Sequence, residues 1–188
     1  MTTVPSEAFG VPDITVWTLG HSTRSFDEFL ALLEENHIQL LVDVRHFPTS
    51  KRVPWAAKAS LAEALRDHRI GYEHFVDLGG YRKARSDSVN TSWRNSSFRG
   101  YADHMASPGF AAALDRLLAL AAESRAAIMC AEAVPWKCHR SLLSDALLAR
   151  GVRVVDILSP EKTEEHRLTK FARVDGGQVT YPGAKKGV

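Results

Sequence analysis

Only two cysteines, Cys130 and Cys138, occur in the 188 residues, so the chain lacks the disulfide framework that stabilises many small secreted proteins. No apolar run reaches the 18 residues that suggest a membrane-spanning helix. The first 17 residues contain neither the basic segment nor the apolar segment of a secretory signal. We therefore expect a protein of the reducing cytoplasm that has no membrane partner.

Charge is also nearly balanced, because a net charge of +2 is too small to indicate a nucleic-acid partner by itself. The hydrophobic fraction of 45% is ordinary for a globular protein and excludes general disorder. The length suits one domain spanning residues 1–188. Within it we expect a long polar loop at about 79–100 and a small tail or hairpin at about 165–188.

Short apolar runs alternate with helical patterns along the chain, which predicts right-handed βαβ units. The predicted fold is α/β, with a mainly parallel sheet of about five strands and helices on both faces. The predicted strands are 15–19, 40–44, 72–76, 127–130 and 152–158. The helix boundary signals are the capping boxes Ser25–Glu28 and Ser60–Glu63, the pair Ser107–Pro108, and the terminal glycines Gly71 and Gly151.

Chemically active residues follow several of these strands, and the carboxyl ends of parallel strands share one edge of the sheet, where ligands bind. The candidate catalytic residues are Cys138, Cys130, His139, His21, Asp43 and Glu132. The candidate ligand-binding residues are Ser22, Arg45, Arg99, Tyr101 and Arg140.

Cys138 is predicted to lie at or near the start of the helix over 138–150. Backbone N–H groups and the helix dipole there favour a thiolate, and Lys137, His139 and Arg140 add positive charge. The alternative is that both cysteines are small buried hydrophobic residues.

Three further interpretations of the cysteines stay open. The first is a phosphatase-like or rhodanese-like loop: the strand LVDVR at 41–45 is similar to a rhodanese motif, but Trp136 stands where an arginine would be needed. The second is a metal site formed by Cys130, Cys138, His139 and, in one version, His21, although the spacing is not that of structural zinc. The third is a reversible disulfide between the two cysteines.

The remaining candidates also have two interpretations each. Ser22 could bind phosphate at a helix start, or it and His21 could simply shape a turn. Asp43 could act as a base or orient a histidine, or it could form a buried ion pair with Arg45. The segment 81–104 mixes basic and aromatic side chains that suit bases and phosphates, or it is a solvated loop.

Together, four motifs resemble the domain-of-unknown-function 488 family: GHST at 20–23, VDVR at 42–45, FRGYAD at 98–103, and CAE at 130–132 followed by CHR at 138–140. The similarity runs from about Trp17 to Leu158 and extends to Leu168–Thr169. The resemblance implies a compact α/β domain and marks the motif residues as the site. It implies no activity, because the family is named for lacking one.

Our leading hypothesis is a thiol-dependent transferase or hydrolase that acts on an anionic, phosphate-bearing ligand such as a nucleotide or nucleic acid. Arg45, Arg99 and Arg140 would hold the anion. The first alternative is a non-catalytic nucleic-acid-binding domain with structural cysteines, and the second is a metal-dependent enzyme. The leading hypothesis includes no resident cofactor or metal.

Overall fold

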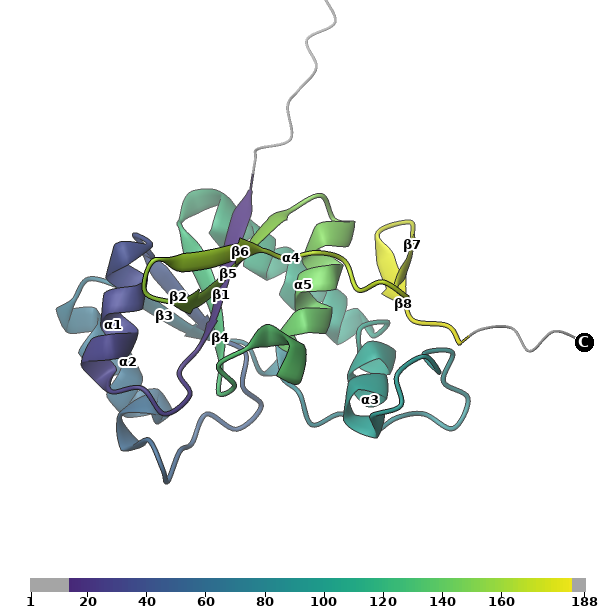
Figure 1. Ribbon diagram of the computed structural model, residues 1–188, viewed down its shortest axis with the longest axis horizontal. Helices are drawn as coiled ribbons and strands as arrows, with labels where there is room; N and C mark the ends of the chain where they lie inside the picture. The colour runs from purple at the N-terminus through teal and green to yellow at the C-terminus, as the bar shows by residue number, and fades with distance from the viewer. Residues whose placement is uncertain (1–13, 184–188) are drawn as a thin grey trace, which may run out of the picture.

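The computed structural model describes residues 14–183 (Figure 1). Two segments lie outside this range. They are residues 1–13, which hold most of the segment compared with a secretory signal, and 184–188, the end of the predicted tail.

The strands are β1 (Thr15–Gly20), β2 (Leu40–Asp43), β3 (Gly71–His74), β4 (Ala126–Cys130), β5 (Arg153–Ser159), β6 (Lys162–Glu165), β7 (Arg173–Asp175) and β8 (Gln178–Thr180). The α-helices are α1 (Phe26–Glu35), α2 (Lys58–Asp67), α3 (Ser96–His104), α4 (Pro108–Glu123) and α5 (Arg140–Ala149). Three short 3₁₀ turns are η1 (Pro54–Ala56), η2 (Val76–Leu78) and η3 (Pro135–Lys137).

The main sheet has the strand order β3-β2-β4-β1-β5-β6, and only the β5–β6 pair is antiparallel. The α/β fold class is therefore confirmed. The five predicted strands are all present, with bounds that differ by one to a few residues. The sixth strand, β6, was missed because its four residues, KTEE, are all exposed and carry no apolar pattern.

Helices cover both faces of the sheet. Successive residues of a strand point to opposite faces, so apolar strand residues need helices to pack against on each face. Leu41, Leu19 and Met129 pack with α1 and α2 in one apolar core. Val42 and Ile128 pack with α3, α4 and α5 in the other. Figure 1 shows the two groups of helices on the left and the right of the strands. Strands buried on both sides explain the continuous apolar runs in the sequence.

The helix signals need two corrections. Ser25 caps α1 with the full capping box, and Ser107 caps α4, as predicted. The predicted capping box at Ser60 is wrong, because α2 begins two residues earlier and its N-cap, Ala57, has no side-chain cap. Gly71 does not end that helix either but begins β3.

The polar loop is shorter than predicted, because α3 begins at Ser96 with Asn95 as its N-cap. Asn90 anchors the loop to the C-terminal segment by accepting a hydrogen bond from the Tyr181 backbone N–H (2.8 Å). The predicted hairpin is present as β7 and β8.

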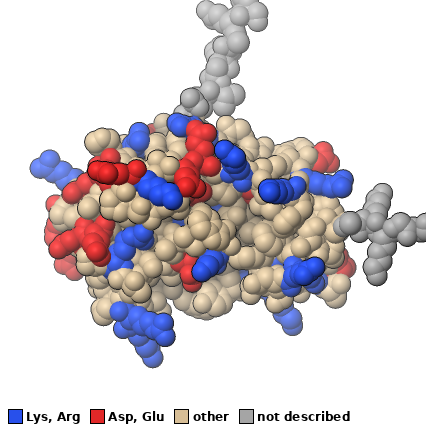
Figure 2. Space-filling view, viewed as in Figure 1, with Lys and Arg blue, Asp and Glu red and all other residues tan. Residues whose placement is uncertain are grey.

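On the face shown in Figure 2, basic and acidic side chains are interspersed rather than gathered into one continuous basic surface. Within residues 14–183, no single helix is long and apolar enough to cross a membrane, although α3 and α4, bent by 76° at their junction, pass the same test as a pair.

The adjacent central strands β1 and β4 bring their carboxyl ends together. Gly20 is the register partner of Cys130, and the His21 N–H donates to the Cys130 carbonyl (3.0 Å). A Cβ on Gly20 would lie 1.7 Å from the Glu132 carbonyl oxygen, so only glycine allows this close approach. The sheet thus sets the loop after β1 directly against the loop after β4.

Candidate functional site

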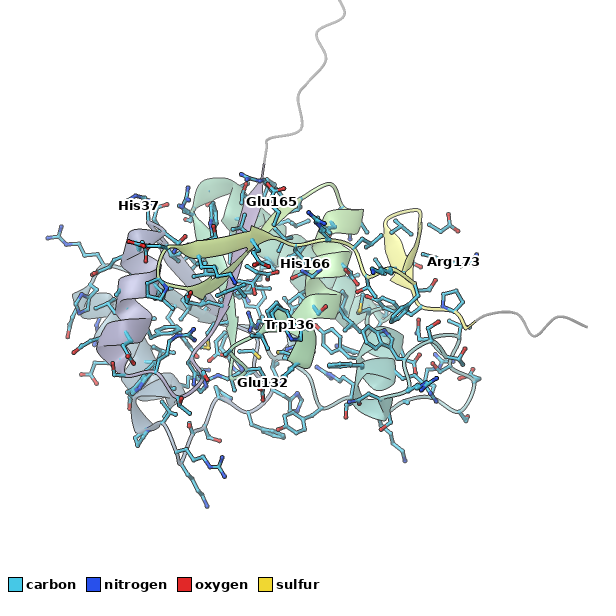
Figure 3. All side chains as sticks on the ribbon, viewed as in Figure 1. His37, Glu132, Trp136, Glu165, His166 and Arg173 are labelled. Carbon is cyan, nitrogen blue, oxygen red and sulfur yellow. The ribbon has the colours of Figure 1, made fainter. Side chains whose placement is uncertain are left out.

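A cavity of about 420 Å³ opens at this edge of the sheet. Figure 3 labels Glu132 and Trp136, which lie on the loop between β4 and α5 beside this edge. Seven of the residues predicted from sequence line the cavity: His21, Arg45, Tyr101, Cys130, Glu132, Cys138 and His139. The topology therefore gathers residues that are more than 100 positions apart along the chain.

The two thiols are the centre of this arrangement. Cys130 ends β4, and Cys138 lies between η3 and α5; both are free thiols and only 4% exposed. Their sulfur atoms and a ring nitrogen of His139 all lie within 4.8 Å of one another. Both cysteines belong to one of the two apolar cores, as the hydrophobic interpretation requires, but the polar groups of His139 and Arg140 also reach the Cys138 sulfur.

His139 is oriented to accept a proton from Cys138. Its Nε2 donates to the Val44 carbonyl (3.0 Å), which leaves Nδ1 without a proton, 3.6 Å from the Cys138 sulfur. Burial lowers the pKa of His139, so the ring is neutral at pH 7. A neutral Nδ1 facing a thiol is the geometry of a general base and its nucleophile.

Arg140 stabilises the thiolate form of Cys138. Its side chain is fully buried and donates to Thr18 Oγ1 (2.5 Å) and to the Glu132 carbonyl (2.5 Å), while its backbone N–H lies 3.5 Å from the Cys138 sulfur. Burial alone would raise the pKa of Cys138. The hydrogen bond from Cys130 and the Arg140 charge and hydrogen bonds outweigh it and lower this pKa to about 7. The same hydrogen bond, then burial, raises the pKa of Cys130 well above its usual range.

Arg45 lines the cavity and is held in place by an ion pair with Asp43. Its guanidinium donates to both carboxylate oxygens (2.5–3.1 Å), and the Tyr72 hydroxyl donates to the same carboxylate (2.7 Å). Arg45 Nη1 lies 3.4 Å from His21 Nε2, and burial lowers the pKa of His21. The buried-pair interpretation of Asp43 and Arg45 thus matches their geometry, and the pair positions His21.

Four predicted residues do not line the cavity. Asp43 and Arg140 are fully buried just behind it. Ser22 turns away in the left-handed region (φ 50°), and its backbone N–H donates to Ala131. Arg99 donates to the Trp93 carbonyl (2.8 and 3.1 Å). Their catalytic and binding roles stay predictions.

Sequence reasoning missed several lining residues. They come from the loop after β2 and from the turn after η2, and they include Phe47, Thr49, Ser50 and Gly80. The pair Gly79–Gly80 was the available signal, because adjacent glycines indicate a close approach of backbone to another group.

The three donor atoms permit more than one chemistry. A thiolate beside a base can act as a nucleophile. Two thiols and an imidazole are also donors that Zn²⁺ prefers, and the hydrogen bond from His139 Nε2 is the kind that orients a metal-binding histidine. Two sulfurs this close could also form a disulfide after a small movement.

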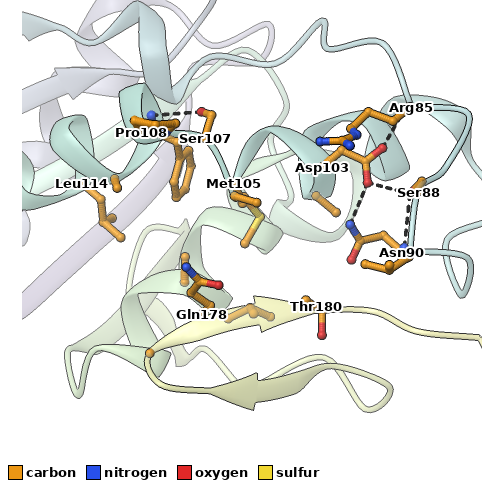
Figure 4. Close-up of a pocket in the computed structure, with 18 of the residues that line it drawn as sticks. Arg85, Ser88, Asn90, Asp103, Met105, Ser107, Pro108, Leu114, Gln178 and Thr180 are labelled. Atoms are coloured by element: carbon orange, nitrogen blue, oxygen red, sulfur yellow. Dashed lines mark hydrogen bonds between the residues drawn. The ribbon is translucent and has the colours of Figure 1, made fainter.

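Another cavity, of about 570 Å³, lies away from the thiols, between α3, α4 and the β7–β8 hairpin (Figure 4). Its two acidic residues already have partners: Asp103 accepts hydrogen bonds from Ser88, Asn90 and the Arg85 backbone, and Asp87 pairs with the Arg85 side chain. The thiol cavity is the stronger candidate, because two thiols and an imidazole, which can act as nucleophile, base or metal ligands, converge on it.

Comparisons with known proteins agree with the family assigned from motifs. Neither the curated proteins nor the solved structures contain a match to this chain. A family model does match, over residues 25–147, which covers β2 to β4 and most of α5. The chain belongs to the family described as Domain of unknown function DUF488.

Proposed function

We propose that this chain is a thiol-dependent enzyme, a transferase or hydrolase, that acts on an anionic, phosphate-bearing ligand. The observation that carries the proposal is Cys138, a buried thiol that lines the cavity with His139 Nδ1 at 3.6 Å and the Arg140 backbone N–H at 3.5 Å. A location in the cytoplasm remains part of the proposal, because free neighbouring thiols suit a reducing compartment.

The chemistry needs only two protein groups. Where Cys138 is a thiol, His139 Nδ1 takes its proton as the sulfur bonds to the electrophilic centre of the ligand. The bond to the leaving group breaks, and the leaving group departs with the electron pair and the proton from His139. Water or a second acceptor then attacks the same centre, His139 takes the proton of this nucleophile, and Cys138 leaves as a thiolate.

The preference for an anion follows from Arg140. Among the described residues its guanidinium has no carboxylate partner, and its acceptors are a hydroxyl and backbone carbonyls. Such a buried charge favours an anion nearby, which the Cys138 thiolate or a ligand supplies. Lys137 adds positive charge to the cavity, against the Glu132 carboxylate, while the charge of Arg45 is offset by Asp43.

The test is the rate of alkylation of each cysteine, followed by mass spectrometry between pH 5 and 10. We expect Cys138 to react with a midpoint near pH 7, as its pKa requires, and Cys130 to stay unreactive. We also expect the ratio of the iodoacetate rate to the iodoacetamide rate to exceed the ratio for glutathione, because iodoacetate is an anion. Cys130→Ser and Cys138→Ser identify the reacting sulfur. A midpoint near the ordinary thiol value, or a ratio no higher than that for glutathione, contradicts the proposal.

The closeness of the three donor atoms favours a metal-dependent enzyme as the second candidate. Elemental analysis of the purified protein separates the two. Stoichiometric zinc that leaves with a chelator, together with Cys138 alkylation only after its removal, would replace the thiol mechanism with this one.

A further inference from the structure

Two aromatic rings lie exposed at the mouth of the thiol cavity. Phe47 is 60% exposed and Tyr81 is 84% exposed, and both line the cavity. Their ring centroids are 5.6 Å apart, and the His46 ring lies 4.5 Å from the Phe47 ring. Adjoining exposed aromatic rings at the entrance of a cavity are typical of a binding surface.

The backbone holds these rings close to the reactive groups. A Cβ on Gly79 would lie 2.9 Å from the His46 backbone, and one on Gly80 would lie 3.1 Å from His139 Nδ1. The glycine pair therefore passes between the two histidines, and the ring of Tyr81, the next residue, lies 6.4 Å from the His46 ring. Tyr81 itself has φ +59°, a left-handed conformation that costs free energy for an L-residue and is common at ligand-binding sites.

A polar atom beside the rings lacks a partner. Nδ1 of His46 is buried and has no hydrogen-bond partner among the described residues. Because buried polar groups are normally satisfied, this nitrogen would gain a partner if the His46 ring turned it toward a ligand in the cavity. His46 lines the same cavity as the thiols.

We propose that Phe47 and Tyr81 form an aromatic platform for a planar ring of the substrate, which makes the substrate a mononucleotide. Because the two ring planes are inclined by 59°, the base stacks on one ring and meets the other at its edge. This inference rests on the proposed function. Stacked on the platform, the base places its edge near His46, and the phosphate extends inward toward Lys137 and Arg45. A cavity of 420 Å³ has the size of sites for small molecules rather than for a polymer.

The experiment compares AMP with ribose 5-phosphate, which has the same phosphate and sugar but no base. The readout is protection of Cys138 from iodoacetamide, supported by calorimetric binding. We expect AMP to protect at a concentration about 5- to 150-fold lower, the range for stacking of one base on an aromatic side chain. Phe47→Ala and Tyr81→Gly should reduce this difference while ribose 5-phosphate protection stays the same.

The variants are chosen so that folding does not confuse the result. Tyr81→Gly removes the ring and also relieves the positive φ, so the loop should keep its conformation. Trp136→Ala is the matched control, because Trp136 is also 60% exposed but does not line this cavity. Trp136→Ala should alkylate at the unprotected rate of the natural chain, and protection of each platform variant is measured against its own unprotected rate.

Equal protection by AMP and ribose 5-phosphate, or an unchanged AMP advantage in both platform variants, would overturn the platform but leave the anion-binding thiol enzyme in place. Protection by a single-stranded oligonucleotide with strong salt dependence, without protection by AMP, would replace the mononucleotide with nucleic acid. An ordinary pH midpoint for Cys138 without ligand would instead overturn the proposed function.

Discussion

His166 connects the C-terminal segment to the sheet through two carboxylates, and this predicts a loss of stability in alkali. Its Nε2 lies 3.1 Å from an Asp145 oxygen and its Nδ1 lies 3.2 Å from an Asp156 oxygen. Burial opposes the charged ring, but the hydrogen bonds and charges of the two aspartates outweigh it and raise the pKa of His166 to about 9.

A raised folded-state pKa means that the proton stabilises the folded chain. The stabilisation is complete below the unfolded pKa of 6.5 and is lost as the pH rises through 9. The difference between 6.5 and about 9, at about 1.4 kcal/mol for each pKa unit, sets an upper bound of about 3.5 kcal/mol, and partial solvent access at the edge of the network reduces it.

The assay is urea unfolding of the natural chain and of His166→Asn at pH 6 and pH 9.5. Other groups titrate in this range, Cys138 among them, so the informative quantity is the difference in unfolding free energy between the two proteins. This difference should shrink by about 1–3 kcal/mol between the two pH values. His37→Asn is the control, because His37 is exposed on the far side of α1 from His166 (Figure 3). A difference that stays constant or grows with pH would refute the reasoning.

Two further predictions concern Arg140 and Gly20. Arg140→Gln removes the buried charge beside the thiol, so the pH midpoint for alkylation of Cys138 should move up from about 7. The chain should also lose about 3 kcal/mol or more of unfolding free energy, because the partners of Arg140 are left unpaired. Gly20→Ala would force a Cβ to within 1.7 Å of the Glu132 carbonyl oxygen, so thermal unfolding should show a large loss of stability or no folded protein. Gly109→Ala is its control, because a Cβ there meets only a side-chain atom at 3.9 Å, and it should be neutral or slightly stabilising.

Features with a local chemical cause could be predicted from sequence. Ser25 and Ser107 cap their helices because the orphan N–H groups need acceptors within three residues. Ser60 carried the same signal but lies inside α2, whose start is stabilised instead by the Lys58 N–H donating to the Pro48 carbonyl (2.9 Å). That acceptor is ten residues away and leaves no local pattern.

The placement of the site could be predicted only in part for the same reason. Parallel strands imply a shared edge, and the motifs supplied Cys130 and His139. The contribution of Phe47 and His46 depends on the route of the loop after β2. That route depends on Gly79 and Gly80 lying against the two histidines, which is a tertiary contact.

The start of α5 decides whether the site can work as a thiol and a base. Successive side chains of an α-helix point about 100° apart, so a helix that began at Cys138, as the sequence pattern suggested, would separate Cys138 from His139. The structure instead begins α5 at Arg140 and leaves Cys138 extended (φ −137°, ψ 152°). This extended residue turns its sulfur toward the His139 ring and the Arg140 backbone N–H. A difference of two residues in a helix boundary therefore creates the pairing on which the proposed chemistry depends.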